Sequence, residues 1–171
     1  VLIGGPATGK TTLINNLKTQ GYCCMDEISR HVTIEAQKNG VEQLFLKDPI
    51  LFSKHLLDSR KKQFLNAQKS KESIVFFDRG LPDIVAYLDY IKSDYDQEFI
   101  STCEKYKYEK IFILPPWKKI YKTDNERYES FDQLLEIDKY LKKWYSKFGY
   151  DIVEVDKGSV DERLEFILNR I

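Results

Sequence analysis

The chain has 171 residues, a length that suits one domain with one hydrophobic core. Its 27 Lys and Arg residues balance 27 Asp and Glu residues, which argues against a nucleic-acid partner or charge-driven binding to a membrane. Three cysteines make no disulfide framework and no apolar run is long enough to span a membrane, so we expect a single cytoplasmic domain over residues 1–171.

The first predicted elements surround a glycine-rich loop. Residues 1–3 are apolar and β-favouring, and they predict the end of a buried parallel strand. Because the sequence opens inside this strand and its only methionine is Met25, we expect native residues before Val1. Apolar residues at helical spacing after Lys10 predict a helix that stops at Gly21.

A second strand is predicted over residues 22–25, and it delivers Asp26 and Glu27 at its carboxyl end. Helical patterns follow over residues 28–38 and 50–71, and the segment between them is expected to be a loop. Both acids are therefore expected at the edge of the sheet where the connecting loops form the site.

The third strand has the clearest signal in the chain. Residues 73–77 show no polar alternation, so this strand must be covered on both faces. It ends at the segment 78–80. Two helices that cover the sheet are predicted after it, one around residues 84–91 and one over residues 96–106.

The remaining sequence predicts two more strands, over residues 111–114 and 151–155, with a polar insertion and a helix over residues 131–148 between them. A final helix is predicted after Ser159. This helix and the one over residues 131–148 each begin with a capping-box pair, Ser159 with Glu162 and Ser130 with Gln133. Five strands alternating with helices predict an α/β fold with a five-stranded, mostly parallel sheet and helices on both faces.

Residues 4–11 match the phosphate-loop (Walker A) pattern G-x-x-x-x-G-K-[ST] at every fixed position, after a strand and before a helix. Glycines let backbone N–H groups turn inward around phosphate oxygens, and the start of the helix favours the anion. Lys10 is expected to reach the β- and γ-phosphates, and Thr11 to offer its hydroxyl to magnesium. The alternative is a tight glycine-rich turn with a chance lysine, which the flanking strand and helix disfavour. The residues predicted to bind nucleotide are Gly4, Gly5, Pro6, Ala7, Thr8, Gly9, Lys10, Thr11 and Thr12.

Asp78 follows the apolar third strand. A carboxylate at such a strand end completes the magnesium site of nucleotide-binding folds, usually through coordinated water, so Asp78 is the predicted metal-site and catalytic acid. Its alternative role is to cap the next helix. Arg79 is predicted to point to substrate or phosphate, or else to pair with Asp83.

Glu27 leaves the second strand where an acceptor would bind. It is predicted to accept a hydroxyl proton or to hold a sugar hydroxyl, and the alternative is a solvated surface acid. Asp26 is the competing candidate for this role. Arg30, one turn further along the chain, is a predicted substrate contact.

A polar, charge-rich segment, residues 122–127, is predicted to close over the site as a flap. Phosphoryl transfer spreads negative charge over the equatorial oxygens, so a cation that arrives over the γ-phosphate lowers the barrier. Arg127 is the predicted catalytic cation. Lys118 and Lys122 are weaker candidates, since such lysines are more often solvated surface.

Three motifs in this order carry a family resemblance: the phosphate loop, the D-R-G-L-P-D segment at 78–83, and the P-P-W and D-N-E-R elements within 115–127. With them the chain resembles the small AAA-type ATPase/kinase-like P-loop NTPase family, which includes the ribosylnicotinamide kinase domain of bacterial NAD-biosynthesis regulators. The resemblance implies a three-layer P-loop NTPase fold, kinase-like, with a lid segment at about 115–130.

The resemblance also implies binding of ATP with Mg²⁺ and transfer or hydrolysis of the γ-phosphate. By matching positions, Gly9, Lys10 and Thr11 would bind nucleotide and magnesium, Asp78 would support the metal and Arg127 would be the lid arginine. The chain is too short to hold the accessory helical domain of ring-forming ATPases, so a hexameric motor is not expected.

Two functions follow from these observations. The first is an ATP-dependent small-molecule kinase whose nucleoside-like or other hydroxyl-bearing acceptor lies between Glu27, Arg30 and Arg79. The alternative is a nucleotide-dependent ATPase or regulatory binding module without a small-molecule acceptor. An acceptor that accelerates ATP consumption would distinguish them.

Overall fold

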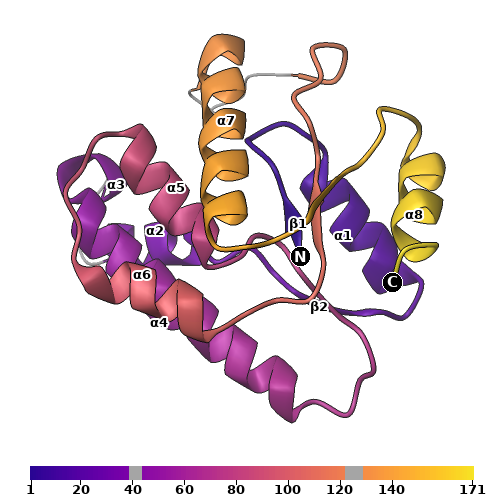
Figure 1. Cartoon of the computed structure of the whole chain (residues 1–171), viewed down its shortest axis with the longest axis horizontal. Helices are drawn as coiled ribbons and strands as arrows, with labels where there is room; N and C mark the ends of the chain where they lie inside the picture. Colours follow the sequence, from indigo (N-terminus) through magenta and orange to yellow (C-terminus); the bar gives the residue numbers. More distant parts are fainter. Residues whose placement is uncertain (39–43, 122–128) are drawn as a thin grey trace.

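The computed structural model describes residues 1–38, 44–121 and 129–171 of the chain. Strands and helices alternate through these residues (Figure 1). The strands are β1 Leu2–Ile3, β2 Cys23–Met25, β3 Val75–Phe77, β4 Ile111–Ile113 and β5 Ile152–Glu154. Each is slightly shorter than its apolar run, because the outer residues of a run need not have a partner in the ladder.

The described strands form one parallel arrangement. β4 lies between β1 and β5 and pairs with both, with Leu2 opposite Phe112. β2 pairs with β3. A bridge between Leu2 and Asp78, with the Arg79 amide donating to the Leu2 carbonyl at 3.0 Å, joins the two groups. The order β2-β3-β1-β4-β5 confirms the predicted sheet, and every described pairing is parallel.

The helices follow the predicted segments closely. They are α1 Lys10–Thr19, α2 Ser29–Lys38, α3 Leu44–Lys47, α4 Pro49–Lys69, α5 Pro82–Tyr90, α6 Gln97–Lys105, α7 Phe131–Lys147 and α8 Val160–Leu168. The short helix α3 corrects the expectation of a loop before α4. Four residues are too few to show a helical period in the sequence.

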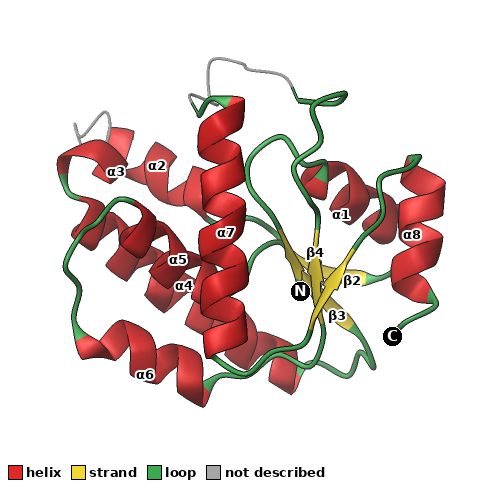
Figure 2. Cartoon of the chain, turned by 45° about the horizontal axis from the view of Figure 1, so that its top comes forward, coloured by secondary structure: helices red, strands yellow, loops and turns green. Residues whose placement is uncertain are grey.

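Helices cover both faces of the sheet, as predicted (Figure 2). α1 and α8 lie on one face, and their apolar residues join a core cluster with Leu2 and Phe112. The larger cluster on the other face takes apolar residues from α4, α5 and α7. Successive residues of β3 show the division, since Phe76 belongs to the first cluster and Phe77 to the second.

Both predicted capping boxes are present. The Ser130 amide donates to the Gln133 side chain at 2.7 Å, and the Gln133 amide donates back to the Ser130 hydroxyl at 3.2 Å. Ser159 and Glu162 make the same exchange at the start of α8. These pairs satisfy amides that no helical carbonyl can reach, so α7 and α8 begin where the sequence predicted.

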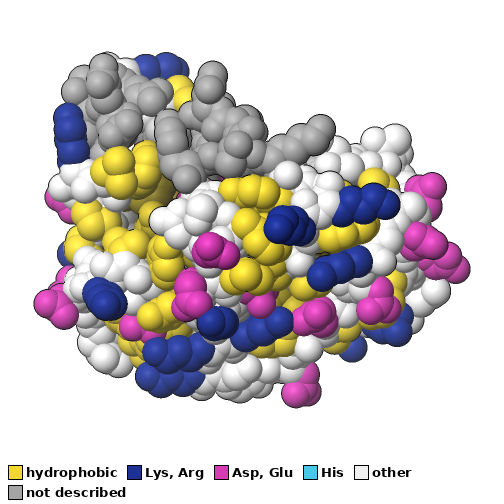
Figure 3. Space-filling model, turned by 90° about the horizontal axis from the view of Figure 1, so that it is seen from above, with side chains coloured by type: hydrophobic (Ala, Val, Ile, Leu, Met, Phe, Trp, Pro, Cys, Tyr) yellow, Lys and Arg dark blue, Asp and Glu magenta, His cyan; other side chains and the backbone are white. Residues whose placement is uncertain are grey.

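Acidic and basic side chains are interspersed over the described part of the surface seen in Figure 3. This mixture agrees with the neutral net charge of the chain. Among the described helices, none combines the length and the apolar character that crossing a membrane requires.

Candidate functional site

The phosphate loop connects the end of β1 to the start of α1. Its first glycine, Gly4, has φ of 140°, and a Cβ atom there would lie 2.6 Å from the Leu114 carbonyl oxygen. A side chain at this position would therefore collide with the backbone just after β4. The Thr8 hydroxyl donates to the Gly5 carbonyl at 2.9 Å across the loop. Pro6 and Ala7 are partly exposed at its tip.

Lys10 is buried beneath the loop that it follows. Its side-chain ammonium donates to the carbonyl oxygens of Gly4 and Gly5, both at 2.7 Å. Burial, assisted by the positive charge of Arg79, lowers the pKa of Lys10 to about 7, although nearby carboxylates oppose the change. A phosphate anion would strongly stabilise the charged form of an ammonium group in such surroundings. Thr11 and the neighbouring Thr12 are exposed on the first turn of α1.

Asp78 lies at the carboxyl end of β3, as predicted, and is only 5% exposed. One of its carboxylate oxygens, Oδ1, is buried and has no hydrogen-bond partner among the described residues. Burial raises the pKa of Asp78, and the charges of Lys10 and Arg79 partly offset this rise. Leu81 occupies the N-cap of α5, so the alternative in which Asp78 caps that helix is wrong.

Glu27 is held by two arginines. Its Oε1 accepts from Arg60 Nη2 and from the Ser29 amide, both at 3.2 Å, and its Oε2 accepts from Arg79 Nε. Burial alone would raise the pKa of Glu27, but the two guanidinium groups and the amide lower it to about 2. Glu27 is therefore ionised at neutral pH and is not a free surface acid.

The competing acid, Asp26, lies apart from this cluster. Its side chain is 60% exposed and pairs with Lys18 of α1. Asp26 is thus the solvated acid of the two, and Glu27 is the one that joins the site.

Arg79 contacts both the phosphate loop and Glu27. Its Nη1 donates to the Gly4 carbonyl of the phosphate loop at 3.2 Å and to Asp83 at 3.3 Å, while Nε donates to Glu27. Glu27 and Asp83 raise the pKa of Arg79 against the effect of burial. Arg79 therefore makes the predicted pair with Asp83 and also lies against the loop that would bind phosphate.

Sequence reasoning missed two buried contributors to this cluster. Arg60 of α4 donates to the Gly80 carbonyl at 2.8 Å as well as to Glu27, and Tyr145 of α7 donates to Asp83 at 2.6 Å. Arg60 carries a signal in the sequence, because it interrupts the apolar face of α4 one turn before Phe64. A charged residue on a buried helix face usually has a specific partner.

Arg30, the predicted substrate contact, lies in the first turn of α2. Arg127 and Lys122, the predicted lid cations, lie outside the described residues. Within the predicted lid segment, Pro115 and Pro116 are buried, and Lys118 is exposed.

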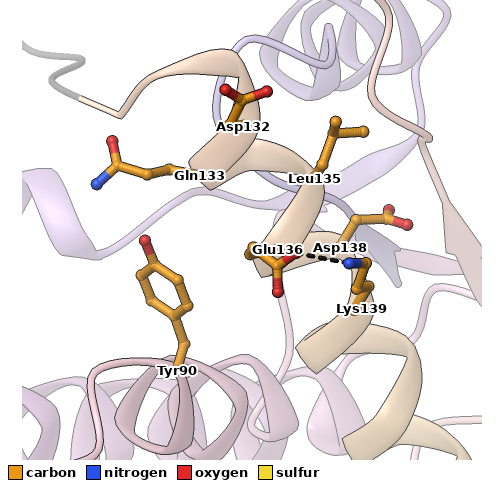
Figure 4. A pocket seen from close by; sticks show the side chains of 7 residues that line it. All are labelled: Tyr90, Asp132, Gln133, Leu135, Glu136, Asp138 and Lys139. Carbon is orange, nitrogen blue, oxygen red and sulfur yellow. Dashed lines mark hydrogen bonds and ion pairs between the residues drawn. The ribbon is translucent and has the colours of Figure 1, made fainter.

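A separate surface depression of about 570 Å³ lies between α5 and the start of α7 (Figure 4). Tyr90 stands on one side, and Glu136 and Lys139 of α7 pair with each other at 2.6 Å on the other. None of the predicted site residues lines it. The chemistry predicted for this chain therefore belongs to the phosphate loop and not to this depression.

The fold and the loop define the class of protein. Three features are the architecture of a P-loop NTPase with a kinase-like fold: a phosphate loop between β1 and α1, a buried carboxylate just after the adjacent strand β3, and a parallel sheet with helices on both faces. A family model described as an AAA domain matches residues 1–163, and the chain belongs to that family.

Solved structures of a deoxyadenosine kinase from M. mycoides share the fold. The structure with the products dCMP and a flexible dCDP matches with a TM-score of 0.69 at 19% identity, covering 99% of this chain and 96% of that one. The structures with dCTP and with dATP match with TM-scores of 0.66 and 0.63, at 18% and 16% identity and the same coverage. No curated protein matches the chain.

Proposed function

We propose that this protein is a phosphotransferase that moves the γ-phosphate of ATP, bound with Mg²⁺, to a small hydroxyl-bearing, nucleoside-like acceptor. The observation that carries the proposal is the position of Glu27 and Arg79. They form an ionised pair, and Arg79 also contacts the Gly4 carbonyl at 3.2 Å, so the pair stands beside the phosphate loop.

The donor side uses the loop amides and Lys10 to bind the phosphates. The unpartnered Asp78 oxygen fits a water ligand of magnesium, because a buried carboxylate oxygen without a partner carries a free-energy penalty that such a contact would remove. Thr11 and Asp78 would hold the ion, which neutralises charge on the transferred group. Arg127 remains the predicted lid arginine.

The side chains that could contact an acceptor are those exposed to solvent. The side chains of Glu27 and Arg79 are 24% and 22% exposed, whereas those of Arg60 and Asp83 are each only 4% exposed. Glu27 and Arg79 are therefore the groups that would touch an acceptor, and the buried pair would hold them in place.

In the proposed reaction the acceptor hydroxyl donates a hydrogen bond to Glu27. The oxygen of the acceptor hydroxyl forms a bond to the γ-phosphorus. At the same time the bond between that phosphorus and the β,γ-bridging oxygen breaks, and ADP leaves. The hydroxyl proton passes to the Glu27 carboxylate and then to solvent. The low pKa of Glu27 is compatible with this role, because the transition state of phosphoryl transfer is loose and needs little deprotonation before bond formation.

The nucleoside class of acceptor is supported by the kinase from M. mycoides, whose structures hold deoxynucleotides. A panel that contains deoxyadenosine, deoxycytidine, ribosylnicotinamide and a free pentose tests this choice. With Mg-ATP present, we expect one of the nucleosides to accelerate ADP release, with one phosphorylated nucleoside formed per ADP.

Lys10→Ala is the control, and it should remove both ATP binding and turnover. The proposal is contradicted if no acceptor accelerates ADP release while ATP binds normally. If a protein partner alone accelerates it, the nucleotide-dependent ATPase or regulatory module is the correct function.

A further inference from the structure

Arg163 of α8 is buried against the phosphate loop. The residue is only 5% exposed, and its Nη2 donates to the Thr8 carbonyl oxygen at 3.0 Å. Its Nε is buried and has no hydrogen-bond partner among the described residues. No carboxylate of the described chain forms an ion pair with it. A buried guanidinium without a carboxylate is unfavourable unless another group uses its charge.

The contact is close and depends on a glycine. Gly9 has φ of 91°, and a Cβ atom there would lie 2.9 Å from Arg163 Nη1 and 3.7 Å from Ile120 Cδ1. The guanidinium therefore occupies space that a side chain at Gly9 would need. Figure 2 shows α8, the helix that carries Arg163, beside α1 on one face of the sheet.

The hydrogen bond to Thr8 has a geometric consequence. In a trans peptide the C=O and N–H groups point in opposite directions. Arg163 holds the Thr8 carbonyl toward its own guanidinium group, so the N–H of Gly9 in the same peptide points away from Arg163. Inward N–H groups are the ones that bind phosphate oxygens.

We propose that Arg163 is a positioning residue for the donor nucleotide: it fixes the Thr8–Gly9 peptide with its N–H toward the phosphates, and its positive charge strengthens the binding of a polyphosphate. This inference rests on the part of the proposed function that assigns nucleotide to the loop. It does not depend on the acceptor.

The test compares Arg163→Met, which removes the charge and the donor but keeps an extended side chain, with Arg163→Lys, which keeps the charge. Arg170→Met is the matched control, because Arg170 lies just beyond the end of α8 and, among the described residues, donates only to the Phe166 carbonyl. Calorimetry measures the Kd of Mg-ATP, ADP and AMP for each variant. Kinetics with the acceptor then separate the two KM values from kcat, and thermal unfolding reports the Tm.

We expect Arg163→Met to weaken Mg-ATP binding about tenfold, the effect of one lost charge-assisted hydrogen bond. The loss should be largest for ATP and smallest for AMP, because the number of phosphates sets the charge that Arg163 meets. Arg163→Lys should recover part of the affinity. Arg170→Met should bind like the wild type, and the KM of the acceptor should change little in every variant.

The inference is overturned if Arg163→Met binds ATP as tightly as the wild type, or if the losses for ATP and AMP are equal and follow the fall in Tm. If Arg163→Met does not fold, Arg163→Gln replaces it, since the amide can donate to Thr8 without a charge. Affinity equal to that of the wild type in that variant would also overturn the inference. Failure of the wild type to bind ATP would overturn this inference and the proposed function together. If the wild type binds ATP normally but no acceptor accelerates ADP release, only the proposed kinase activity is contradicted.

Discussion

Two carboxylates beside the phosphate loop have opposite electrostatic surroundings. Glu27 accepts from two guanidinium groups, which lower its pKa to about 2. Asp78 is buried, one of its oxygens has no partner among the described residues, and burial raises its pKa. Glu27 therefore stabilises the folded protein by its charge, while the charge of Asp78 opposes folding. This difference yields two predictions at the scale of single residues.

The first prediction concerns Glu27→Gln. At pH 7 the substitution should lower the free energy of unfolding by about 2–3 kcal/mol, because it leaves the guanidinium of Arg60 buried without a carboxylate. Between pH 4.5 and 2 the unfolded chain binds a proton at this group more readily than the folded protein. The contribution of Glu27 is thus complete above about pH 4.5 and is lost as the pH falls toward 2.

Urea unfolding of the wild type and Glu27→Gln at several pH values measures this. The difference between the two proteins should shrink as the pH falls from 6 to 3. Asp26→Asn is the control, and its exposed pair with Lys18 should contribute less than about 1 kcal/mol. A difference that is constant across this pH range would mean that the ion pairs of Glu27 do not set its pKa.

The second prediction concerns Asp78→Asn. Removing a buried charge that has an unpartnered oxygen should leave the Tm unchanged or raise it, while Mg²⁺-dependent turnover should fall by about 100-fold or more. Differential scanning calorimetry and the ADP-release assay measure the two effects.

Asp83→Asn is the contrasting variant. Asp83 is also buried, but it accepts from Tyr145, the Gly80 amide and Arg79. Its substitution should lower the Tm. If Asp78→Asn destabilises the protein as much as Asp83→Asn does, Asp78 is a structural residue and the metal site lies elsewhere.

At the scale of elements, the packing of α7 on α5 supports the acceptor side of the site. Tyr145 of α7 is completely buried and donates to Asp83 of α5 at 2.6 Å, and Asp83 in turn pairs with Arg79. The capping box at Ser130 fixes where α7 begins and therefore which of its residues faces α5. α7 thus holds Arg79, the arginine proposed to contact the acceptor, through Asp83.

Tyr145→Phe tests this connection. Removing the hydroxyl leaves a buried carboxylate oxygen without one of its donors, which should lower the free energy of unfolding by about 1–3 kcal/mol. The KM of the acceptor should rise more than the KM of ATP, because Arg79 loses its orientation. Urea unfolding and steady-state kinetics measure both effects.

Tyr140→Phe, on the same helix, is the control. Its hydroxyl makes no hydrogen bond among the described residues, so stability and both KM values should stay close to those of the wild type. Equal changes in the two KM values for Tyr145→Phe would contradict a specific link between α7 and the acceptor side.

At the scale of the whole molecule, the order of the strands assembles the site. β3 lies beside β1, so the residues that follow β3 meet the phosphate loop that follows β1. β2 lies on the far side of β3 and brings Glu27 to Arg79. The carboxyl ends of parallel strands share one edge of a sheet, which explains why residues so distant in the chain form one cluster.

The sequence by itself determined the features that local physics controls. The phosphate loop needs glycines and a lysine at fixed spacing, an apolar strand such as 73–77 must be covered on both faces, and a capping box shows where a helix begins. These signals predicted the strands, most helices and the position of Asp78, because each depends on neighbours a few residues away.

Only the tertiary structure decided between Asp26 and Glu27, because adjacent residues with the same charge look alike until their partners are placed. It also recruited Arg60 and Arg163, which lie far along the chain from the groups they hold. Long-range contacts of this kind leave no periodic pattern in the sequence. They follow from the order of the strands and the packing of helices on the sheet, which set which side chains meet.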